Sequence, residues 1–170
     1  MRNRQKAVSS LVLSALLCAL SIVLARWATI NLGFVHIGFG NLPVVLAGVL
    51  LGPGLGFMVG GVADLIGGVL AGYAINPLIT LGAALIGGVA GLCWHKLPLK
   101  NQTLRLIAAL LPAHLVGSTI INSLALHIFY AYPLAALALR IPNMVGQVVV
   151  EVLALRALLA NASFRKAAGL

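Results

Sequence analysis

Long apolar stretches, separated by short breaks rich in glycine, proline or charge, make up almost the whole chain. The first stretch, Ala7–Ala25, follows a basic N-terminus and is long enough to cross a membrane as a signal-anchor helix. Between Arg26 and Lys96 the only acidic or basic residue apart from histidine is Asp64, so that region must hold several further crossings. The pattern predicts a membrane protein built from helices.

Glycine and proline mark where the later spans begin and end, because proline lacks a backbone donor and glycine permits chain reversal. We expect a loop at Gly33–Gly40, a tight reversal at Gly52–Gly54, a turn at Asn76-Pro77, and a connecting segment bounded by Tyr132-Pro133 and Ile141-Pro142. The spans predicted after the first are Leu42–Leu51, which is short, Leu55–Leu70, Leu78–Trp94, Leu106–Phe129 and Met144–Ala160. The predicted fold class is an all-α integral membrane protein with six transmembrane helices, in a single membrane domain over residues 1–170.

The composition supports this fold class. Of the 170 residues, 62% are hydrophobic and only 8% are charged, whereas a soluble domain has about 25% charged residues. So few charges could not cover a surface that faces water, which excludes a soluble globular domain and a disordered chain.

The formal net charge of +9 comes from basic residues that are grouped along the chain. Nine of the eleven Lys and Arg residues fall in three clusters: Arg2, Arg4 and Lys6; Lys96, Lys100 and Arg105; Arg156, Arg165 and Lys166. With six spans, all three clusters lie on the side of the N- and C-termini, which the positive-inside rule assigns to the cytoplasm. No basic stripe interleaved with aromatic residues occurs, so we expect no nucleic-acid partner.

Both acidic residues lie within predicted spans, where an ionisable group is costly unless it is neutral or paired. His114 and Glu151 lie at similar depth, counted from the cytoplasmic ends of their spans, so we expect them to make contact. Such a pair serves either as polar glue between helices or as part of a ligand-lining surface. Asp64 could accept hydrogen bonds from a donor-rich ligand or from a structural partner within the bundle.

Arg26 and Arg140 stand apart from the basic clusters, and both fall on the outer side of the predicted topology. A guanidinium binds carboxylates in bidentate geometry. Arg140 also heads a stripe of Asn143, Gln147 and Glu151 whose spacing of four places them on one helix face. We expect the two arginines to capture an anionic solute from outside, with interfacial snorkelling as the alternative.

Motifs for ATP binding and for hydrolysis are absent, because no GxxxxGK(S/T), GxSxG or HExxH sequence occurs. His114 and His127 are about 220° apart around a helix and do not form a shared metal face. We therefore expect no catalytic residues, no metal and no cofactor.

Small residues recur at spacings that let helices approach closely in lipid. The glycines spaced by four are Gly48, Gly52, Gly56 and Gly60, followed by Gly87 and Gly91. We interpret them as internal packing faces rather than as a homodimer face. Ala15 and Ala19 form a further pair on the first span, where a neighbouring helix or a separate membrane protein could dock.

The stretch HIGFGNLPVVLAGVLLGPGLGFMVGGVADLIGG, His36–Gly68, resembles the substrate-binding S components of energy-coupling factor (ECF) vitamin transporters, and is most like the folate type. Its LPVVLAG segment, its LLGPGLG turn and the surroundings of Asp64 all fit, as does the RIP sequence at Arg140–Pro142. The resemblance extends to chain length and to the six-span layout.

This resemblance implies a high-affinity vitamin-binding subunit, with folate as the expected vitamin, in the plasma membrane of a bacterium. Such a subunit does not hydrolyse ATP and works with a transmembrane T component and two cytoplasmic ATPase subunits. Ala15 and Ala19 match the family's AxxxA motif for T-component docking, and the substrate is expected on the outer half, under the loop Ala28–Asn41. The candidate substrate-binding residues are Arg26, His36, Asn41, Asp64, Asn76, Arg140, Asn143 and Gln147.

Other functions remain open. An S component for pantothenate or hydroxymethylpyrimidine would share the same layout, and pantothenate is also anionic. A different class would be a small ion-coupled carrier, or an intramembrane enzyme, that uses Asp64 and Glu151. A carrier would take up its solute at the expense of an ion gradient, whereas an enzyme would form product as the purified chain alone.

Overall fold

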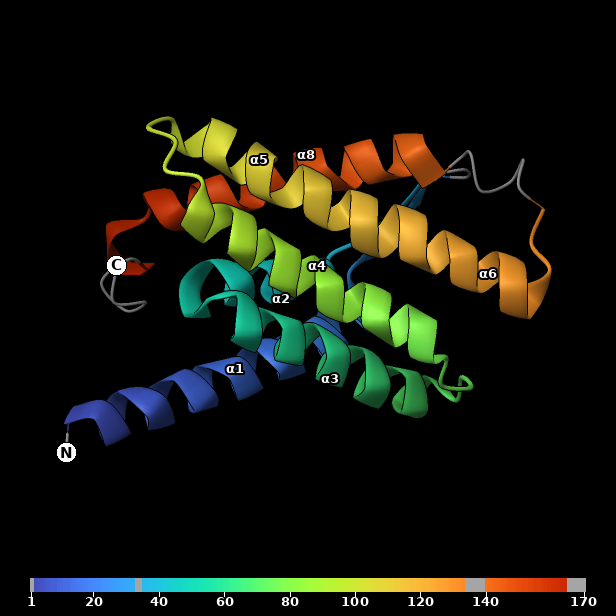
Figure 1. Cartoon of the computed structure of the whole chain (residues 1–170), viewed down its shortest axis with the longest axis horizontal. Coiled ribbons are helices and arrows are strands. Elements are labelled where there is room, and N and C mark those ends of the chain that lie inside the picture. Colours follow the sequence, from blue (N-terminus) through green and yellow to red (C-terminus); the bar gives the residue numbers. More distant parts are fainter. Residues whose placement is uncertain (1, 33–34, 134–139, 165–170) are drawn as a thin grey trace.

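Turn and capping residues divide the chain into a bundle of helices with one short β-hairpin (Figure 1). The computed structural model describes residues 2–32, 35–133 and 140–164. The helices are α1 (Arg2–Trp27), α2 (Asn41–Leu51), α3 (Pro53–Ala71), α4 (Pro77–Lys96), α5 (Gln102–His114), the π-helix η1 (Leu115–Ile121), α6 (Asn122–Tyr130) and α8 (Arg140–Ala160). The strands are β1 (Thr29–Leu32) and β2 (Val35–Gly38).

The helix boundaries follow the residues that mark them in the sequence. Gly52 separates α2 from α3 with a φ of 95°, which side chains rarely permit, and Pro53 then begins α3. Asn76 caps α4, since its Oδ1 accepts hydrogen bonds from the backbone N–H groups of Leu78 at 3.0 Å and Ile79 at 3.4 Å. The predicted reversal at Gly52–Gly54 and the predicted turn at Asn76 are therefore both present.

Five helices of the described chain are long and apolar enough to cross a membrane, and one is shorter. The short helix is α2, whose 11 residues extend about 16 Å, roughly half the hydrocarbon thickness of a bilayer. The five longer helices cover Ala7–Trp27, Pro53–Ala71, Pro77–Lys96, Gln102–Tyr130 and Arg140–Ala160. Of the six spans that the sequence predicts, five are therefore present at full length.

The span predicted at Leu106–Phe129 is one continuous helix of 29 residues, Gln102–Tyr130. Its middle section, η1, has the wider i→i+5 turns of a π-helix. His114 is the last residue before this section, and Asn122 is the first residue after it. The π-helical section is a feature that the hydrophobic pattern does not predict.

The prediction of a loop at Gly33–Gly40 is wrong at Val35–Gly38, because these residues form β2 and pair with β1 as antiparallel strands. In their register Thr29 lies opposite Gly38 and Leu32 lies opposite Val35. A two-stranded hairpin is marginally stable alone, so local sequence gives a weak signal for it and its support must come from neighbouring helices. Outside this hairpin, the elements of the described chain are helical.

Glycine brings α2, α3 and α4 into backbone contact. A Cβ atom on Gly87 would collide with the carbonyl of Gly56, and one on Gly48 would collide with the carbonyl of Gly87. The predicted internal packing faces are thus confirmed at Gly48, Gly56, Gly60, Gly87 and Gly91. Gly52 does not belong to them, because a Cβ there would meet open space and its role is in the turn.

The helices run back and forth along one axis, so that several connections gather at each end of the bundle (Figure 1). The start of α1, the end of α8 and the α4–α5 connection lie at one end. The β-hairpin follows α1 and leads into α2, away from that end. We call the end that holds the start of α1 the terminal end of the bundle.

Candidate ligand-binding site

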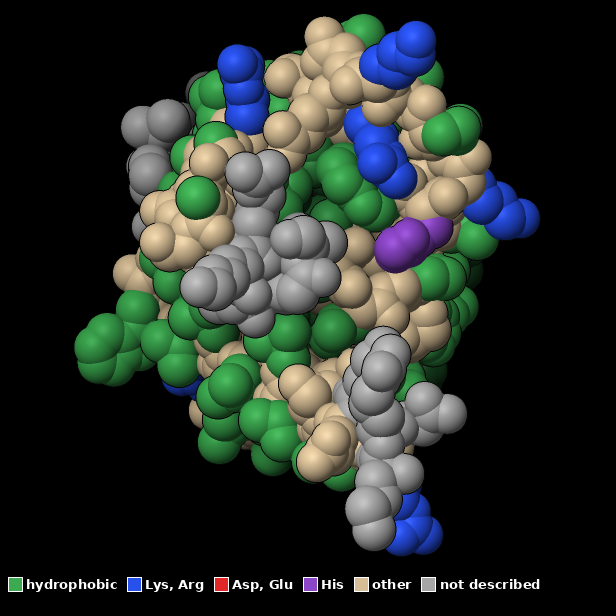
Figure 2. Space-filling model, turned by 90° about the vertical axis from the view of Figure 1, so that its left-hand side faces the viewer, with side chains coloured by type: hydrophobic (Ala, Val, Ile, Leu, Met, Phe, Trp, Pro, Cys, Tyr) green, Lys and Arg blue, Asp and Glu red, His purple; other side chains and the backbone are tan. Residues whose placement is uncertain are grey.

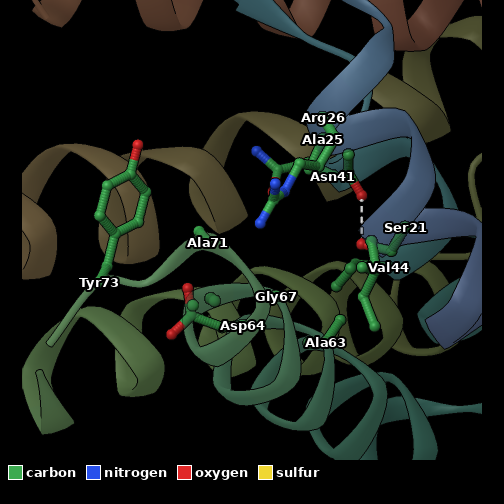
Figure 3. A pocket seen from close by; sticks show the side chains of 15 residues that line it. Ser21, Ala25, Arg26, Asn41, Val44, Ala63, Asp64, Gly67, Ala71 and Tyr73 are labelled. Atoms are coloured by element: carbon green, nitrogen blue, oxygen red, sulfur yellow. Dashed lines mark hydrogen bonds between the residues drawn. The ribbon is translucent and has the colours of Figure 1, made fainter. Parts of the chain in front are cut away.

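A cavity of about 450 Å³ opens between α1, α2 and α3, with one wall residue from α4 (Figure 3). This volume is within the usual range for small-molecule sites, roughly 300–1,000 Å³. Its lining combines small apolar side chains with a few polar groups. The lining residues are Ser21, Ile22, Ala25, Arg26, Gly40, Asn41, Val44, Gly60, Ala63, Asp64, Gly67, Gly68, Ala71, Tyr73 and Ala83.

The cavity brings together three of the predicted substrate-binding residues from three different helices. Arg26 comes from the last turn of α1, Asn41 from the first turn of α2, and Asp64 from α3. Figure 3 shows Arg26 reaching into the cavity from the α1 side, whereas Asp64 lies on the α3 side. Within the described part of the chain, Arg26 and Asp64 form no ion pair with each other.

Asp64 is held in place by the neighbouring helix. The hydroxyl of Thr80, in the first turn of α4, donates a hydrogen bond of 2.7 Å to Asp64 Oδ2. A carboxylate can accept several hydrogen bonds, so this contact fixes the group and leaves it acceptor capacity. Asp64 is suited to bind a ligand that presents N–H donors.

Arg26 and Asp64 place opposite charges on facing walls of the same cavity. Arg26 can bind an anionic group, and Asp64 can bind a donor-rich group. Between them the wall consists of small residues such as Gly67 and Ala71, which leave room for a flat molecule. The arrangement suits an elongated ligand that has an anionic end and a flat end rich in hydrogen-bond donors.

Among the other predicted substrate-binding residues, Asn76, Arg140, Asn143 and Gln147 do not line this cavity. Arg140 begins α8, is half-buried, and has a buried Nη1 with no hydrogen-bond partner among the described residues. Asn143 lies in the first turn of α8 and is half-buried. Asn76 is engaged in capping α4. His36 belongs to β2, but its side chain lies outside the described residues.

The expected contact between His114 and Glu151 is confirmed. His114 Nε2 lies 2.7 Å from Glu151 Oε2, and both side chains are buried, with exposed fractions of 1% and 0%. The other carboxylate oxygen, Glu151 Oε1, accepts a hydrogen bond of 2.6 Å from Gln147 Nε2. Gln147 also bonds the backbone of Gly38 in β2. Gln147 is therefore part of a buried polar chain outside the cavity.

A second, apolar groove of about 360 Å³ lies between α1 and α3. Ala15 and Ala19 line it, and both are exposed. The remaining lining residues are Leu11, Ser14, Cys18, Ile22, Leu55, Met58, Val59, Val62 and Ile66. The AxxxA pair thus borders an open groove in the described chain.

Sequence reasoning missed two residues of the cavity and one that supports it. Ser21 lies about one turn before Arg26 and donates a hydrogen bond of 2.7 Å to the carbonyl of Gly40. Tyr73 follows α3 and lines the cavity, although the sequence suggests only an interfacial aromatic residue. Thr80 supports Asp64 from α4, and counting outward from the α3–α4 turn does not reveal the pair, because Asp64 lies seven residues before the end of α3 and Thr80 only three after the start of α4.

No group of three or more His, Cys, Asp or Glu side chains among the described residues could hold a metal ion.

Comparison with known proteins gives concordant results. Residues 9–162 match the family described as "ECF transporter, substrate-specific component". The folate transporter FolT of Clostridium novyi (strain NT) is 36% identical over 62 residues, and this match spans only 36% of each chain.

Two solved structures are also similar. A crystal structure of FolT bound with folic acid has a TM-score of 0.65 and 29% identity, over 85% of this chain and 89% of the other. A structure of the S component of a bacterial ECF transporter has a TM-score of 0.69, over 91% of this chain and 95% of the other. Because the second structure is only 21% identical in sequence, its similarity shows that the two proteins share a fold and shows nothing further.

Proposed function

Because the chain belongs to the substrate-specific components of ECF transporters, we propose that it binds folate in the cavity between α1, α2 and α3 and serves as the vitamin-capturing subunit of an importer. A chain of this family is a substrate-binding component rather than an enzyme. The observation that carries the proposal is the cavity with Arg26 and Asp64 on opposite walls. The similarity to the structure of FolT bound with folic acid supports the choice of vitamin.

Folate matches the two charged walls chemically. Its glutamate tail carries carboxylates, which a guanidinium binds well. Its flat pterin ring carries neighbouring N–H groups, which can donate hydrogen bonds to a carboxylate. We assign the tail to Arg26 and the pterin to Asp64. Asn41 lines the same cavity and is proposed as a further contact. Direct contacts also stay proposed for His36, Asn76, Arg140 and Asn143, whereas Gln147 bonds the hairpin backbone instead.

The proposed topology places the terminal end of the bundle in the cytoplasm, with α2 completing six membrane segments. Figure 2 shows Lys and Arg side chains on the terminal end and, among the residues drawn in colour, no Asp or Glu. Cytoplasmic regions of membrane proteins carry an excess of Lys and Arg. The cavity residues Arg26 and Asn41 would then lie toward the outer side of a bacterial plasma membrane.

The partners proposed are a transmembrane T component and two cytoplasmic ATPase subunits, which hydrolyse the ATP that drives import. The groove beside Ala15 and Ala19 is the proposed T-component docking surface, because small side chains let a partner helix approach closely.

Changing Ala19→Phe should fill the groove and abolish capture of a co-expressed T component while folate binding is retained. Leu16→Phe is the matched control, since Leu16 is exposed on the same helix and does not line the groove. Equal capture by both variants would move the docking surface elsewhere.

Titration of the purified protein with oxidised and reduced folates tests the binding site. Arg26→Gln and Asp64→Asn should each weaken binding about 10-fold or more, because each removes a charged hydrogen bond. Arg156→Gln is the control, since Arg156 is exposed near the end of α8 and does not line the cavity. Pantothenate in the same assay tests the main alternative. If the wild-type protein binds no folate at micromolar levels, the folate assignment is wrong.

A further inference from the structure

A buried chain of hydrogen bonds connects α5, through α8, to the β-hairpin. It begins at the His114–Glu151 pair, continues from Glu151 Oε1 to Gln147 Nε2 at 2.6 Å, and ends at Gly38 in β2. Gln147 is 7% exposed, and the other two side chains are almost completely buried. A polar network this deep in a membrane protein must be satisfied by its own members, because neither water nor lipid supplies partners.

Gln147 bonds the backbone of Gly38 in the way that a neighbouring strand would. The Gly38 N–H donates to Gln147 Oε1 at 3.2 Å, and Gln147 Nε2 donates to the Gly38 carbonyl at 2.6 Å. The amide nitrogen has two N–H groups, and its second one serves Glu151. Every polar atom of the Gln147 side chain is therefore engaged, which fixes its rotamer.

The segment that Gln147 holds forms part of the cavity wall. The hairpin connects Arg26, in the last turn of α1, to Asn41, the first residue of α2, and both residues line the cavity. Two residues after Gly38, the carbonyl of Gly40 accepts the hydrogen bond from Ser21. The end of β2 is thus attached to α1 through Ser21 and to α8 through Gln147.

From this geometry we infer that Gln147, oriented by Glu151 and His114, is a positioning residue that fixes the wall around Gly40 and Asn41 by bonding the Gly38 backbone. It controls how long a ligand stays in the cavity without touching that ligand. The part of the inference that concerns ligand residence rests on the proposed folate function, whereas the part that concerns the backbone does not. This role differs from the direct substrate contact that the sequence suggests for Gln147.

The matched variants are Gln147→Met and Val149→Met. Both place the same side chain on α8, but Val149 is 52% exposed and bonds nothing in the hairpin. Hydrogen–deuterium exchange of the ligand-free protein should show about tenfold faster exchange in residues 38–41 for Gln147→Met, because two hydrogen bonds to Gly38 are lost. Val149→Met should exchange at the wild-type rate. Folate should leave Gln147→Met about tenfold faster than wild type, with little change in its association rate.

A second pair of variants tests the orienting role of Glu151. Glu151→Gln keeps an acceptor for Gln147 and can donate to His114, so exchange in residues 38–41 should stay within about twofold of wild type. Glu151→Leu should match Gln147→Met. A substitution that merely weakened the fold would raise exchange throughout α8 rather than in this segment. If Gln147→Met does not fold, Gln147→Asn gives the same test, because it keeps the amide on a shorter side chain.

The outcomes separate this inference from the proposed function. Equal exchange in Gln147→Met and Val149→Met would overturn the positioning role whether or not folate binds. Faster exchange with an unchanged folate dissociation rate would overturn the effect on ligand residence. If the wild-type protein binds no folate, the proposed function fails, and the exchange measurement still decides the role of Gln147.

Discussion

Two adjacent parts of the bundle are held together by different means. The helices α2, α3 and α4 touch backbone to backbone at glycines, where an added Cβ atom would collide with a carbonyl oxygen. The helices α5 and α8 are joined instead by the buried pair of His114 and Glu151. Within a bilayer the lipid tails are as apolar as leucine, so helices associate by close packing and by hydrogen bonds.

The difference between the two parts predicts opposite sensitivities. The glycine-packed part has no space for additional atoms, so it should be damaged by substitutions that add volume. The polar part depends on complementary groups, so it should be damaged more by removal of one partner than by removal of both. Three substitutions test this contrast, each followed by the free energy of unfolding in mixed detergent micelles.

The largest effect is expected for His114→Leu. It leaves the carboxyl group of Glu151 buried with one partner missing, which should lower the free energy of unfolding by about 3 kcal/mol or more. The double variant His114→Leu/Glu151→Leu removes the carboxyl group and should recover about half of this loss, the rest being the cost of the buried Gln147 N–H that then lacks its acceptor. A double variant as unstable as the single one would contradict the view that the unpaired carboxyl group causes the loss.

An intermediate effect is expected for Gly87→Ala. The new methyl group would meet the backbone of Gly56 and the side chain of Val44, so α3 and α4 must separate slightly. Overpacking of this kind typically costs about 1–3 kcal/mol. A stability equal to that of wild type would show that the glycine contact between α3 and α4 is looser than the structure indicates.

The smallest effect, and of opposite sign, is expected for Gly146→Ala. A Cβ at Gly146 meets nothing within 4 Å, and alanine favours helix over glycine by about 0.8–1.0 kcal/mol. This substitution in α8 should therefore raise the free energy of unfolding slightly. It is the matched control for Gly87→Ala, and a loss of stability here would indicate that alanine is harmful at any glycine of the bundle.

Much of the helical framework could be predicted from the sequence, because its boundaries depend on local chemistry. Gly52, Pro53 and Asn76 act through their own backbone or side chain, and a reader of the sequence can recognise them. The His114–Glu151 contact was also predictable, since it requires only that two polar residues lie at equal depth in neighbouring spans. Arg26 and Asp64 could also be singled out from the sequence, because Arg26 stands apart from the basic clusters and Asp64 is an acidic residue within a predicted span.

Features that depend on distant partners were not predictable in this way. The hairpin is supported by Gln147, which lies 109 residues away from Gly38. The stripe from Arg140 to Glu151 indicated one helix face correctly, but it could not show that Gln147 would meet a strand rather than the cavity.

The π-helical section of the long helix has a consequence for how this chain can vary. An i→i+5 turn accommodates one residue more than an α-helical turn, so η1 contains a surplus residue relative to an unbroken α-helix. Loss of one residue within Leu115–Ile121 would convert the section to α-helix and leave the faces on either side in phase. His114 would still point at Glu151, and Asn122 would still lie beside Gly82. In a membrane-spanning helix, a deletion ordinarily rotates every later residue by about 100°, whereas this section can lose one residue and keep the contacts on either side of it.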